Sequence, residues 1–396
     1  MKKSLLYIDL FAGCGGLSLG LYNAGWQGFF AVEKNADAFS TLECNLIQSK
    51  SHFSWPSWLP QSEIDIYDLI KNYRKELESL RGKVDLVVGG PPCQGFSMAG
   101  KRVENDIRNK LVNAYIEFID IVKPKVLFLE NVHGFTVGFT EKNKRGKPYS
   151  VIVKEKLEEM GYHVDSKIID VSDYGVPQSR KRFILIGSKL DNQFNFFEQL
   201  ENSREKFLES KGIKGKVTIE QAIGDLLQQN GVYKTKKMPR FDFGKYDNIN
   251  SNYQKLMREG CDQYPDSHRF ANHNTETTKI FKGLMKRTDK MTRVTPSMNL
   301  VKGFKKRGVT VLKEGCVCST VTSIPDDFIH YLEPRILTVR EMARIQSFPD
   351  WFHFCGKYTT GGELRKKDVP RYTQVANAVP PLFAEQVGII LKNMVK

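Results

Sequence analysis

The first half of the chain alternates between short apolar runs and longer segments whose apolar residues recur every three or four positions. Runs rich in β-branched and aromatic residues predict strands at 5–11, 29–33, 84–88, 126–132, 166–171 and 183–188. Helical spacing predicts helices between most of these runs, at 36–46, 68–80, 110–122 and 151–160. This alternation requires crossover connections, so we expect an α/β fold with a mainly parallel, doubly wound sheet and helices on both faces.

The last two predicted strands are connected differently from the others. Residues 162–187 contain both strand runs and no helical segment between them. Strands joined without a crossover helix pair antiparallel, and an otherwise parallel sheet carries such a pair at its edge. We therefore expect an antiparallel pair at one edge of the sheet.

The alternation stops between about residues 190 and 330. Strand runs are few there, and Asn, Lys, Gly and Thr are frequent, which predicts a second, less regular domain. Helical patterns return at 338–348, where Thr338 and Glu341 have capping-box spacing. A further amphipathic helix is predicted at 380–395, with prolines at its start.

The charge balance favours a polyanionic partner. The 396 residues include 60 Lys and Arg against 45 Asp and Glu, which gives a net charge of +15. Such an excess suits nucleic acid first and an anionic membrane surface second, although it also serves solubility alone. No apolar stretch approaches the roughly 20 residues of a membrane span, and Asp9 interrupts an N-terminal run that loosely resembles a signal peptide.

The cysteines predict a reduced, cytoplasmic protein without a metal site. There are seven, an odd number, and no two have C-x-x-C spacing. Cys316 and Cys318 form a C-x-C pair that no second pair completes, so two ordinary buried thiols are a better interpretation than zinc ligands.

A glycine-rich turn follows the first predicted strand. Gly13, Gly15 and Gly16 let the backbone approach a ligand closely at the start of a helix, and Glu33 ends the next strand 20 residues after Gly13. A doubly wound fold places its ribose-binding carboxylate there. The pattern predicts an adenosine cofactor, with a turn needed only for packing as the alternative. The glycine signature is shorter than that of dinucleotide sites, which favours S-adenosylmethionine over NAD. Asp65-Ile66 could reach the adenine.

The stretch GGPPCQGFS, residues 89–97, follows a strand run and presents Cys93 beside the predicted cofactor crevice. Pro91-Pro92 would fix the loop so that the thiol has one position. A thiol needs local positive charge or amide groups to become a nucleophile. A buried core cysteine is the competing interpretation, and the P-P-C-Q context disfavours it.

Glu130 is expected at the same rim, and two arginines are expected on one face of a later strand. Glu130 ends the strand run 126–132 and could donate a proton to a substrate, or merely cap a helix. Arg180 and Arg182 share one face of a strand because they are two residues apart. Two guanidiniums on one face suit a phosphate or a polarised carbonyl, although a solvated basic edge strand has the same pattern.

Taken in order, these motifs resemble those of the DNA (cytosine-5)-methyltransferases, chiefly the enzymes of bacterial restriction–modification systems. The matching segments are DLFAGCGG, AVEKN, GGPPCQGFS, NDIRNKL, ENV, QSRKR, RILTVREMARIQSFPD and QVANAVPP, which run from residue 9 to residue 381. The resemblance implies a doubly wound, Rossmann-like catalytic domain that binds S-adenosylmethionine, formed by 1–190 plus 369–396. It implies a smaller, irregular target recognition domain at 191–368.

The resemblance also implies roles for single residues. Cys93 would attack position 6 of a flipped-out cytosine, Glu130 would hold and protonate ring nitrogen 3, and Arg180 and Arg182 would steady the base and the backbone. Gln94 and Ser97 would contact DNA. The S-adenosylmethionine pocket would be lined by Phe11, Ala12, Gly13, Gly15, Glu33, Asp65, Ile66, Pro91, Leu111 and Asn377.

Two basic regions are candidate DNA contacts. The loop at 97–110, with Lys101 and Arg102, is expected to be mobile and to close over double-stranded DNA. Five cations have spacings of three and four and would form one basic stripe if they lay on a helix, namely Lys279, Lys282, Lys286, Lys290 and Arg293. A solvated lysine face is the alternative.

Three other functions share parts of this pattern. A tRNA cytosine-5 methyltransferase would keep the same motifs, but the long recognition span favours DNA. A catalytically silent DNA-binding protein would not need Cys93 and Glu130 together. A nicotinamide-dependent oxidoreductase would carry the longer glycine signature. Nothing in the sequence requires a dimer, so a monomer is expected.

Overall fold

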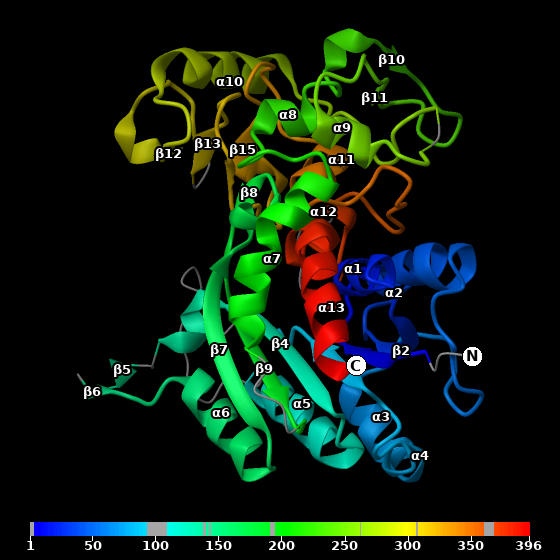
Figure 1. Cartoon of the computed structure of the whole chain (residues 1–396). Helices are drawn as coiled ribbons and strands as arrows, with labels where there is room; N and C mark the ends of the chain where they lie inside the picture. The colour runs from blue at the N-terminus through cyan, green and yellow to red at the C-terminus, as the bar shows by residue number, and fades with distance from the viewer. Residues whose placement is uncertain are drawn as a thin grey trace. The chain divides into compact units, whose positions relative to one another are not determined.

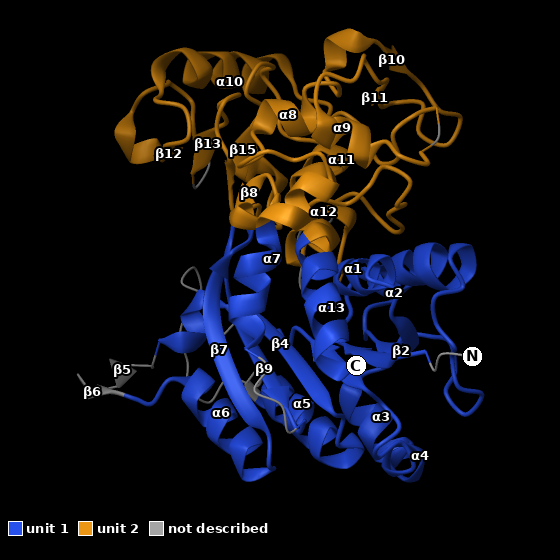
Figure 2. Cartoon of the chain, in the orientation of Figure 1, with its two compact units in different colours: residues 1–171, 180–204, 383–396 blue, residues 172–179, 205–382 orange. Residues whose placement is uncertain are grey.

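The computed structural model describes residues 4–92, 109–137, 140–141, 144–190, 195–261, 263–305, 308–359 and 368–396. The chain forms two compact units (Figure 2). Unit 1 comprises residues 1–171, 180–204 and 383–396, and unit 2 comprises residues 172–179 and 205–382. The sequence placed the domain boundaries at 190/191 and 368/369, whereas the chain crosses between the two units at 171/172, 179/180, 204/205 and 382/383.

Unit 1 is built on a six-stranded sheet in the order β2-β1-β3-β4-β9-β7. Figure 1 labels β2, β4, β9 and β7 of this sheet. The first four strands pair parallel, whereas β9 pairs antiparallel with both β4 and β7. This confirms the α/β fold and the antiparallel pair at the sheet edge. The strands are β1 Leu6–Leu10, β2 Gln27–Val32, β3 Leu86–Gly89, β4 Val126–Val132, β7 His163–Asp170 and β9 Lys181–Ser188.

Helices cover both faces of this sheet. On one face, Ile8 and Leu10 of β1 share a buried core with apolar residues of α3, α4, α5 and α6. On the other face, Asp9 bonds to α1, which packs against α13. The helices are α1 Gly16–Asn23, α2 Ala36–Leu42, α3 Ile66–Asn72, α4 Arg74–Glu78, α5 Asn109–Val122, α6 Tyr149–Glu159, α7 Phe196–Ser210 and α13 Pro381–Val395. Short strands β5 Thr140–Glu141 and β6 Lys144–Arg145 pair with each other.

Two predicted helices of unit 1 are divided in the structure. The segment predicted at 36–46 becomes α2 followed by a π-helical stretch, Glu43–Ser49. The segment predicted at 68–80 becomes α3 and α4, because Tyr73 leaves the helical region with φ −123° and ψ 28°. Apolar periodicity reports which face is buried, and it does not report such local breaks.

Unit 2 contains short elements, as the irregular pattern predicts. Its three-stranded sheet, in the order β12-β13-β15, packs with α10 around Phe281, Leu284 and Val309. The helices are α8 Ile219–Ile223, α9 Asn252–Met257, α10 Thr275–Arg287, α11 Val339–Ile345 and α12 Arg371–Asn377. The strands are β8 Gln178–Ser179, β10 Val232–Tyr233, β11 Phe243–Gly244, β12 Arg293–Val294, β13 Val309–Val311, β14 Cys318–Ser319 and β15 Phe328–Ile329.

Helix α11 carries the most buried charges of unit 2. Its predicted capping box is present, since Thr338 accepts from the Glu341 amide and Glu341 accepts from the Thr338 amide. Arg340 and Arg344 are fully buried at 0% exposure, and both lie beside Asp350. Glu341 binds Arg335 at 2.7 Å. Buried ion pairs made by residues of the segment 335–350 therefore stabilise the core of unit 2.

No helix among the described ranges is long and apolar enough to cross a membrane. Within those same ranges, His, Cys, Asp and Glu side chains form no group of three that could hold a metal ion.

Candidate active site

The glycine-rich turn connects β1 to α1 through backbone conformations that favour glycine. Gly13 and Gly15 have φ of 57° and 91°, and Phe11 has φ of 61° although it has a side chain. Such strain in a non-glycine residue is often found at functional sites. Ala12 is buried and its amide donates to Val32 O at 3.0 Å, while Gly15 N donates to Ala12 O at 2.9 Å. A Cβ at Gly13 would meet no atom within 4 Å, so open space lies above the turn.

Glu33 lies across this turn, as its spacing predicted. One carboxylate oxygen accepts from Gly13 N at 2.9 Å and the other accepts from Asn35 N at 2.8 Å. Burial raises the pKa of Glu33, although these two backbone hydrogen bonds oppose the shift. The carboxylate is thus fixed at the mouth of the turn, where a ribose would present its hydroxyls.

The Asp65-Ile66 segment is adjacent to Glu33, because Ile64 N donates to Glu33 O at 2.8 Å. Asp65 caps α3 by accepting from Tyr67 N at 2.9 Å. The Ile66 side chain is 2% exposed and packs into the core, which leaves only its backbone for contact with a ligand.

Sequence reasoning missed a buried polar pair beneath the turn. Ser18 Oγ of α1 donates to Asp9 Oδ2 of β1 at 2.6 Å, and both residues are almost completely buried. Burial raises the pKa of Asp9 to about 7, Ser18 opposes the shift, and the charge of Glu33 adds to it. The signal was an acid inside the apolar run YIDLF, where only a specific partner justifies the burial of a carboxyl group.

Glu130 and Arg182 form an ion pair at the carboxyl end of β4. Arg182 Nε lies 2.8 Å from Glu130 Oε1, and the two side chains are 12% and 14% exposed. The antiparallel pairing of β4 with β9 places Arg182 opposite Val132, two residues from Glu130. The pair is therefore partly screened from water and still reachable from the surface.

The chain leading to Cys93 passes directly beside this pair. A Cβ at Gly90 would lie 3.3 Å from Glu130 Oε2, so only glycine leaves the carboxylate clear. Pro91 is buried, and its carbonyl accepts from Asn131 Nδ2 at 3.3 Å. Gly90 and Asn131 were not among the predicted site residues, although both lie within quoted motifs.

Arg180 is a buried cation near the same pair. Its side chain is 4% exposed, and Nε has no hydrogen-bond partner among the described residues. Burial lowers the pKa of Arg180 well below its ordinary value; the charge of Arg182 lowers it further and the charge of Glu130 raises it. Arg180 lies between β8 and β9 and belongs to neither strand, so a shared strand face for the two arginines stays a prediction.

The structure describes only some of the remaining predicted site residues. Leu111 of α5 is half-buried and packs against the core of unit 1. Asn377 ends α12, is exposed and belongs to unit 2. Cys93, Gln94, Ser97, Lys101 and Arg102, with most of the predicted 97–110 loop, lie outside the described residues.

The predicted basic stripe of unit 2 is only partly correct. Helix α10 ends at Arg287, so Lys290 and Arg293 do not lie on it. Lys290 donates to Tyr331 O at 3.1 Å and lies 3.3 Å from Glu314, while Arg293 lies 3.4 Å from Asp327. Spacing alone could not reveal this, because the three-and-four pattern continues past the residue where the helix stops.

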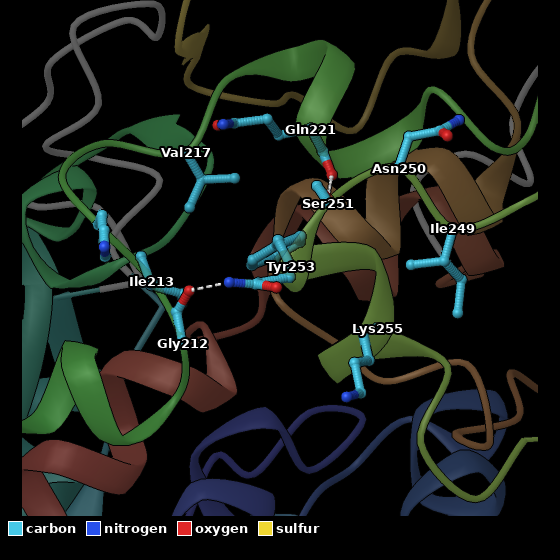
Figure 3. A pocket seen from close by; sticks show the side chains of 11 residues that line it. Gly212, Ile213, Val217, Gln221, Ile249, Asn250, Ser251, Tyr253 and Lys255 are labelled. Atoms are coloured by element: carbon cyan, nitrogen blue, oxygen red, sulfur yellow. Dashed lines mark hydrogen bonds between the residues drawn. The ribbon is translucent and has the colours of Figure 1, made fainter.

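A pocket of about 430 Å³ lies in unit 2 (Figure 3). Asn252 donates to Gly212 O at 2.8 Å and Ser251 donates to Gln221 O at 2.6 Å on its wall. Lys214 and Lys255 also line it. None of the predicted site residues does so.

The sheet, the glycine turn and the carboxylate above it define an α/β enzyme of the adenosine-cofactor class. The family model for C-5 cytosine-specific DNA methylases matches residues 5–393. The chain therefore belongs to the C-5 cytosine-specific DNA methylase family: it is a DNA (cytosine-5) methyltransferase, and S-adenosylmethionine is its methyl donor.

Two curated relatives are similar to this chain over nearly its whole length. Type II methyltransferase M.DdeI of Desulfomicrobium norvegicum is 32% identical over 402 residues, covering 96% of this chain and 87% of the relative. Type II methyltransferase M.XorII of Xanthomonas oryzae pv. oryzae is 30% identical over 400 residues, covering 96% and 83%.

Solved structures agree on the fold. A putative DNA modification methyltransferase encoded within an E. coli prophage has a TM-score of 0.64 at 24% identity, covering 98% of this chain and 99% of that one. The Dnmt2 methyltransferase of S. pombe has a TM-score of 0.56 at 14% identity, covering 99% of each chain.

Proposed function

We propose that the chain methylates position 5 of one flipped-out cytosine in a specific double-stranded DNA sequence, through a transient bond between Cys93 and position 6. The observation that carries this proposal is the Glu130–Arg182 pair beside Gly90. Cys93 follows Gly90 by three residues, which span at most about 11 Å of chain. A nucleophile and a carboxyl group can thus act on one ring.

The chemistry assigns a task to each group. The Cys93 thiolate adds to carbon 6, and the electron pair of the 5,6 double bond moves to carbon 5. Glu130 protonates nitrogen 3, which prevents a build-up of negative charge on the ring. S-adenosylmethionine supplies an electrophilic methyl group to carbon 5. Loss of the carbon-5 proton to water and expulsion of the thiolate then restore the aromatic ring.

Arg182 and Arg180 position these groups. Arg182 holds Glu130 at 2.8 Å and orients its free oxygen, Oε2, toward Gly90. Arg180 adds a second buried positive charge, which favours an electron-rich substrate oxygen or a phosphate nearby. Its Nε has no partner among the residues that the structure describes and would bind such an acceptor.

The cofactor pocket would use the glycine turn of unit 1. Glu33 would accept from the ribose hydroxyls, and Gly13 and Gly15 would let the backbone approach the donor. Phe11, Ala12, Asp65, Ile66, Pro91, Leu111 and Asn377 would complete it. The open space above Gly13 and the fixed carboxylate support this assignment.

Unit 1 would carry catalysis and unit 2 would read the target, with Gln94, Ser97, Lys101 and Arg102 contacting the opened duplex. Base extrusion costs a few kcal/mol of unstacking, which protein contacts must offset. The similarity to Type II methyltransferases supports a role in protecting host DNA within a restriction–modification system. We propose a cytoplasmic monomer.

Trapping on a fluorinated substrate tests the covalent step. DNA with 5-fluorocytosine at the target should form an adduct with the wild type, because the fluorine cannot leave as a proton does. Cys93→Ser should form none. Glu130→Gln should lower kcat by about 10²- to 10⁴-fold while S-adenosylmethionine affinity is unchanged.

Labelled methyl transfer to duplex DNA and to tRNA, run in parallel, tests the substrate. We expect label in DNA only. Label in tRNA with unlabelled DNA would overturn the DNA assignment, and an adduct with Cys93→Ser would overturn the assigned nucleophile.

A further inference from the structure

Helix α10 of unit 2 has one buried face and one basic face. Its N-cap Asn274 accepts from Thr277 N, and Phe281 and Leu284 are 1% and 0% exposed in the core. The opposite face presents Lys279, Lys282 and Lys286, all exposed. The spacing of three and four residues keeps these lysines on one side of the helix.

A second basic segment lies against this helix. Arg287 donates to Leu300 O at 3.1 Å, and a Cβ at Gly283 would meet Val301 at 3.1 Å. Phe304 is 9% exposed and anchors the segment in the same core as α10. Lys302 and Lys305 are exposed beside it. We call this combined face the α10 surface; its cations are Lys279, Lys282, Lys286, Arg287, Lys302 and Lys305.

The lysines of the α10 surface are not neutralised from within. None of its five lysines forms an ion pair with another described residue, and the acids at its margin are Glu276 and the exposed Asp289. Lys290 and Arg293, just beyond the helix, differ because each faces an acid. Like charges gathered without counter-charges repel one another, so an external polyanion that spans them is favoured.

We propose that the α10 surface binds phosphates of the DNA backbone and so positions the duplex without reading its sequence. This inference rests on the proposed function and adds where unit 2 holds its substrate. Lys279 to Lys286 span seven residues, about 10.5 Å at 1.5 Å per residue, or about three phosphates along one strand at 3.4 Å each. Lysine presents a point charge, which suits phosphate better than the paired acceptors of a base edge.

The β10–β11 hairpin is a competing basic region of unit 2. Lys236, Lys237 and Arg240 are exposed in its loop, and the Tyr233 and Tyr264 rings are in tilted contact with their centroids 4.5 Å apart. Aromatic rings with nearby cations suit contacts with bases more than contacts with phosphates alone. The test below therefore includes this hairpin as a separate arm.

The salt dependence of DNA binding measures phosphate contacts directly. The triple variant Lys279→Gln, Lys282→Gln, Lys286→Gln is compared with a matched triple in unit 1, Lys71→Gln, Lys75→Gln, Lys83→Gln. Both remove three exposed lysines. Affinity for a labelled duplex of arbitrary sequence is measured across a salt series. Each phosphate contact contributes about −0.9 to the slope of log K against log salt.

We expect the α10 triple to make the slope shallower by about 2.7, so that the affinity lost between about 50 and 200 mM salt shrinks roughly 40-fold. The matched triple should leave the slope unchanged. Bisulfite mapping of methylated DNA should show the same target sequence for the wild type and the α10 triple, because phosphate contacts carry no sequence information.

Three results would overturn the inference. The first is a salt slope of the α10 triple equal to that of the matched triple. The second is a shallower slope only in a hairpin variant, Lys234→Gln, Lys236→Gln, Lys237→Gln. The third is a changed target sequence in the α10 triple. Methyl transfer by the wild type is measured on the same preparations. Wild type that methylates no DNA would contradict the proposed function itself, whereas active wild type with unaltered α10 slopes contradicts the surface alone.

Discussion

Replacement of Arg344 should destabilise unit 2 strongly, because its guanidinium holds two buried carboxylates at once. It binds Asp225 at 2.6 and 3.1 Å and Asp350 at 2.9 and 2.6 Å. All three side chains are 0% exposed. Burial by itself raises the pKa of Asp350, but Arg344 and Arg340 together hold that pKa below its ordinary value.

Arg344→Met keeps much of the side-chain volume and leaves both carboxylates in the core without their main partner. Removal of one member of a buried pair costs about 3–5 kcal/mol. Arg258 lies 3.4 Å from Asp225, and Arg340 lies 3.7 Å from Asp350, so each acid retains a second cation at longer range. The two losses therefore do not add, and we expect a total within that range.

Hydrogen exchange of the α11 amides measures the loss where it occurs. At 1.36 kcal/mol per tenfold, their protection should fall by roughly 100- to 5,000-fold in Arg344→Met. Arg344→Lys keeps the charge without the forked geometry and should give an intermediate loss. Lys147→Gln breaks a pair whose side chains are 51% and 47% exposed, and should change stability by less than about 1 kcal/mol.

The pH dependence supplies an independent check. Because the folded pKa of Asp350 is lowered, its stabilisation is present above the unfolded pKa and is lost as pH falls through the folded value. In Arg344→Met the Asp350 carboxylate loses the cation that lowers its pKa and accepts a proton more readily, so the difference in urea midpoint from wild type should shrink toward acid pH. A protection loss below tenfold, or a midpoint difference that grows toward acid, would refute the reasoning.

Three further substitutions test unit 1. Burial raises the Asp9 pKa from 3.8 to about 7, so wild type should lose on the order of 4 kcal/mol of unfolding free energy from this group as pH rises between these values. Asp9→Asn should remove this pH dependence of stability in urea titrations, and an equal pH dependence in both proteins would contradict the prediction. Gly20→Ala places a Cβ 2.3 Å from Ala384 Cβ and should cost about 1–3 kcal/mol; Gly315→Ala meets nothing within 4 Å and is its thermal-melting control. Glu33→Gln should weaken S-adenosylmethionine binding about 10- to 100-fold in calorimetry, and unchanged affinity would argue against the ribose contact.

Local signals predicted several elements of both units. The strand run at 126–132 coincides with β4, and the predicted capping box of Thr338 and Glu341 is present. These features depend on neighbours within a few positions, which the sequence shows directly. The spacing between Gly13 and Glu33 predicted an acid at the end of the strand that follows the turn. The structure adds that this acid accepts a hydrogen bond from Gly13 N.

Features that depend on distant segments were not predictable in the same way. Gly90 faces Glu130 because β3 and β4 pair parallel, and Asn131 reaches Pro91 for the same reason. Arginines are mostly exposed in proteins, so nothing in the letters ARIQS indicates that Arg344 is completely buried. Its burial follows from Asp225, which lies more than a hundred residues earlier in the chain.

The net charge of the sequence indicated a polyanionic partner, but it did not indicate which surface binds that partner. Arg335, Arg340 and Arg344 count toward the +15, yet they are at most 4% exposed and each is paired with an acid. Such charges contribute little attraction to a polyanion, because their fields are cancelled within a few ångströms. Attraction at the surface comes from exposed cations, and the α10 surface gathers six of them on and beside one helix. If the α10 triple leaves the salt slope unchanged, DNA does not bind the α10 surface, and a cluster of exposed cations is not what locates the DNA-binding face.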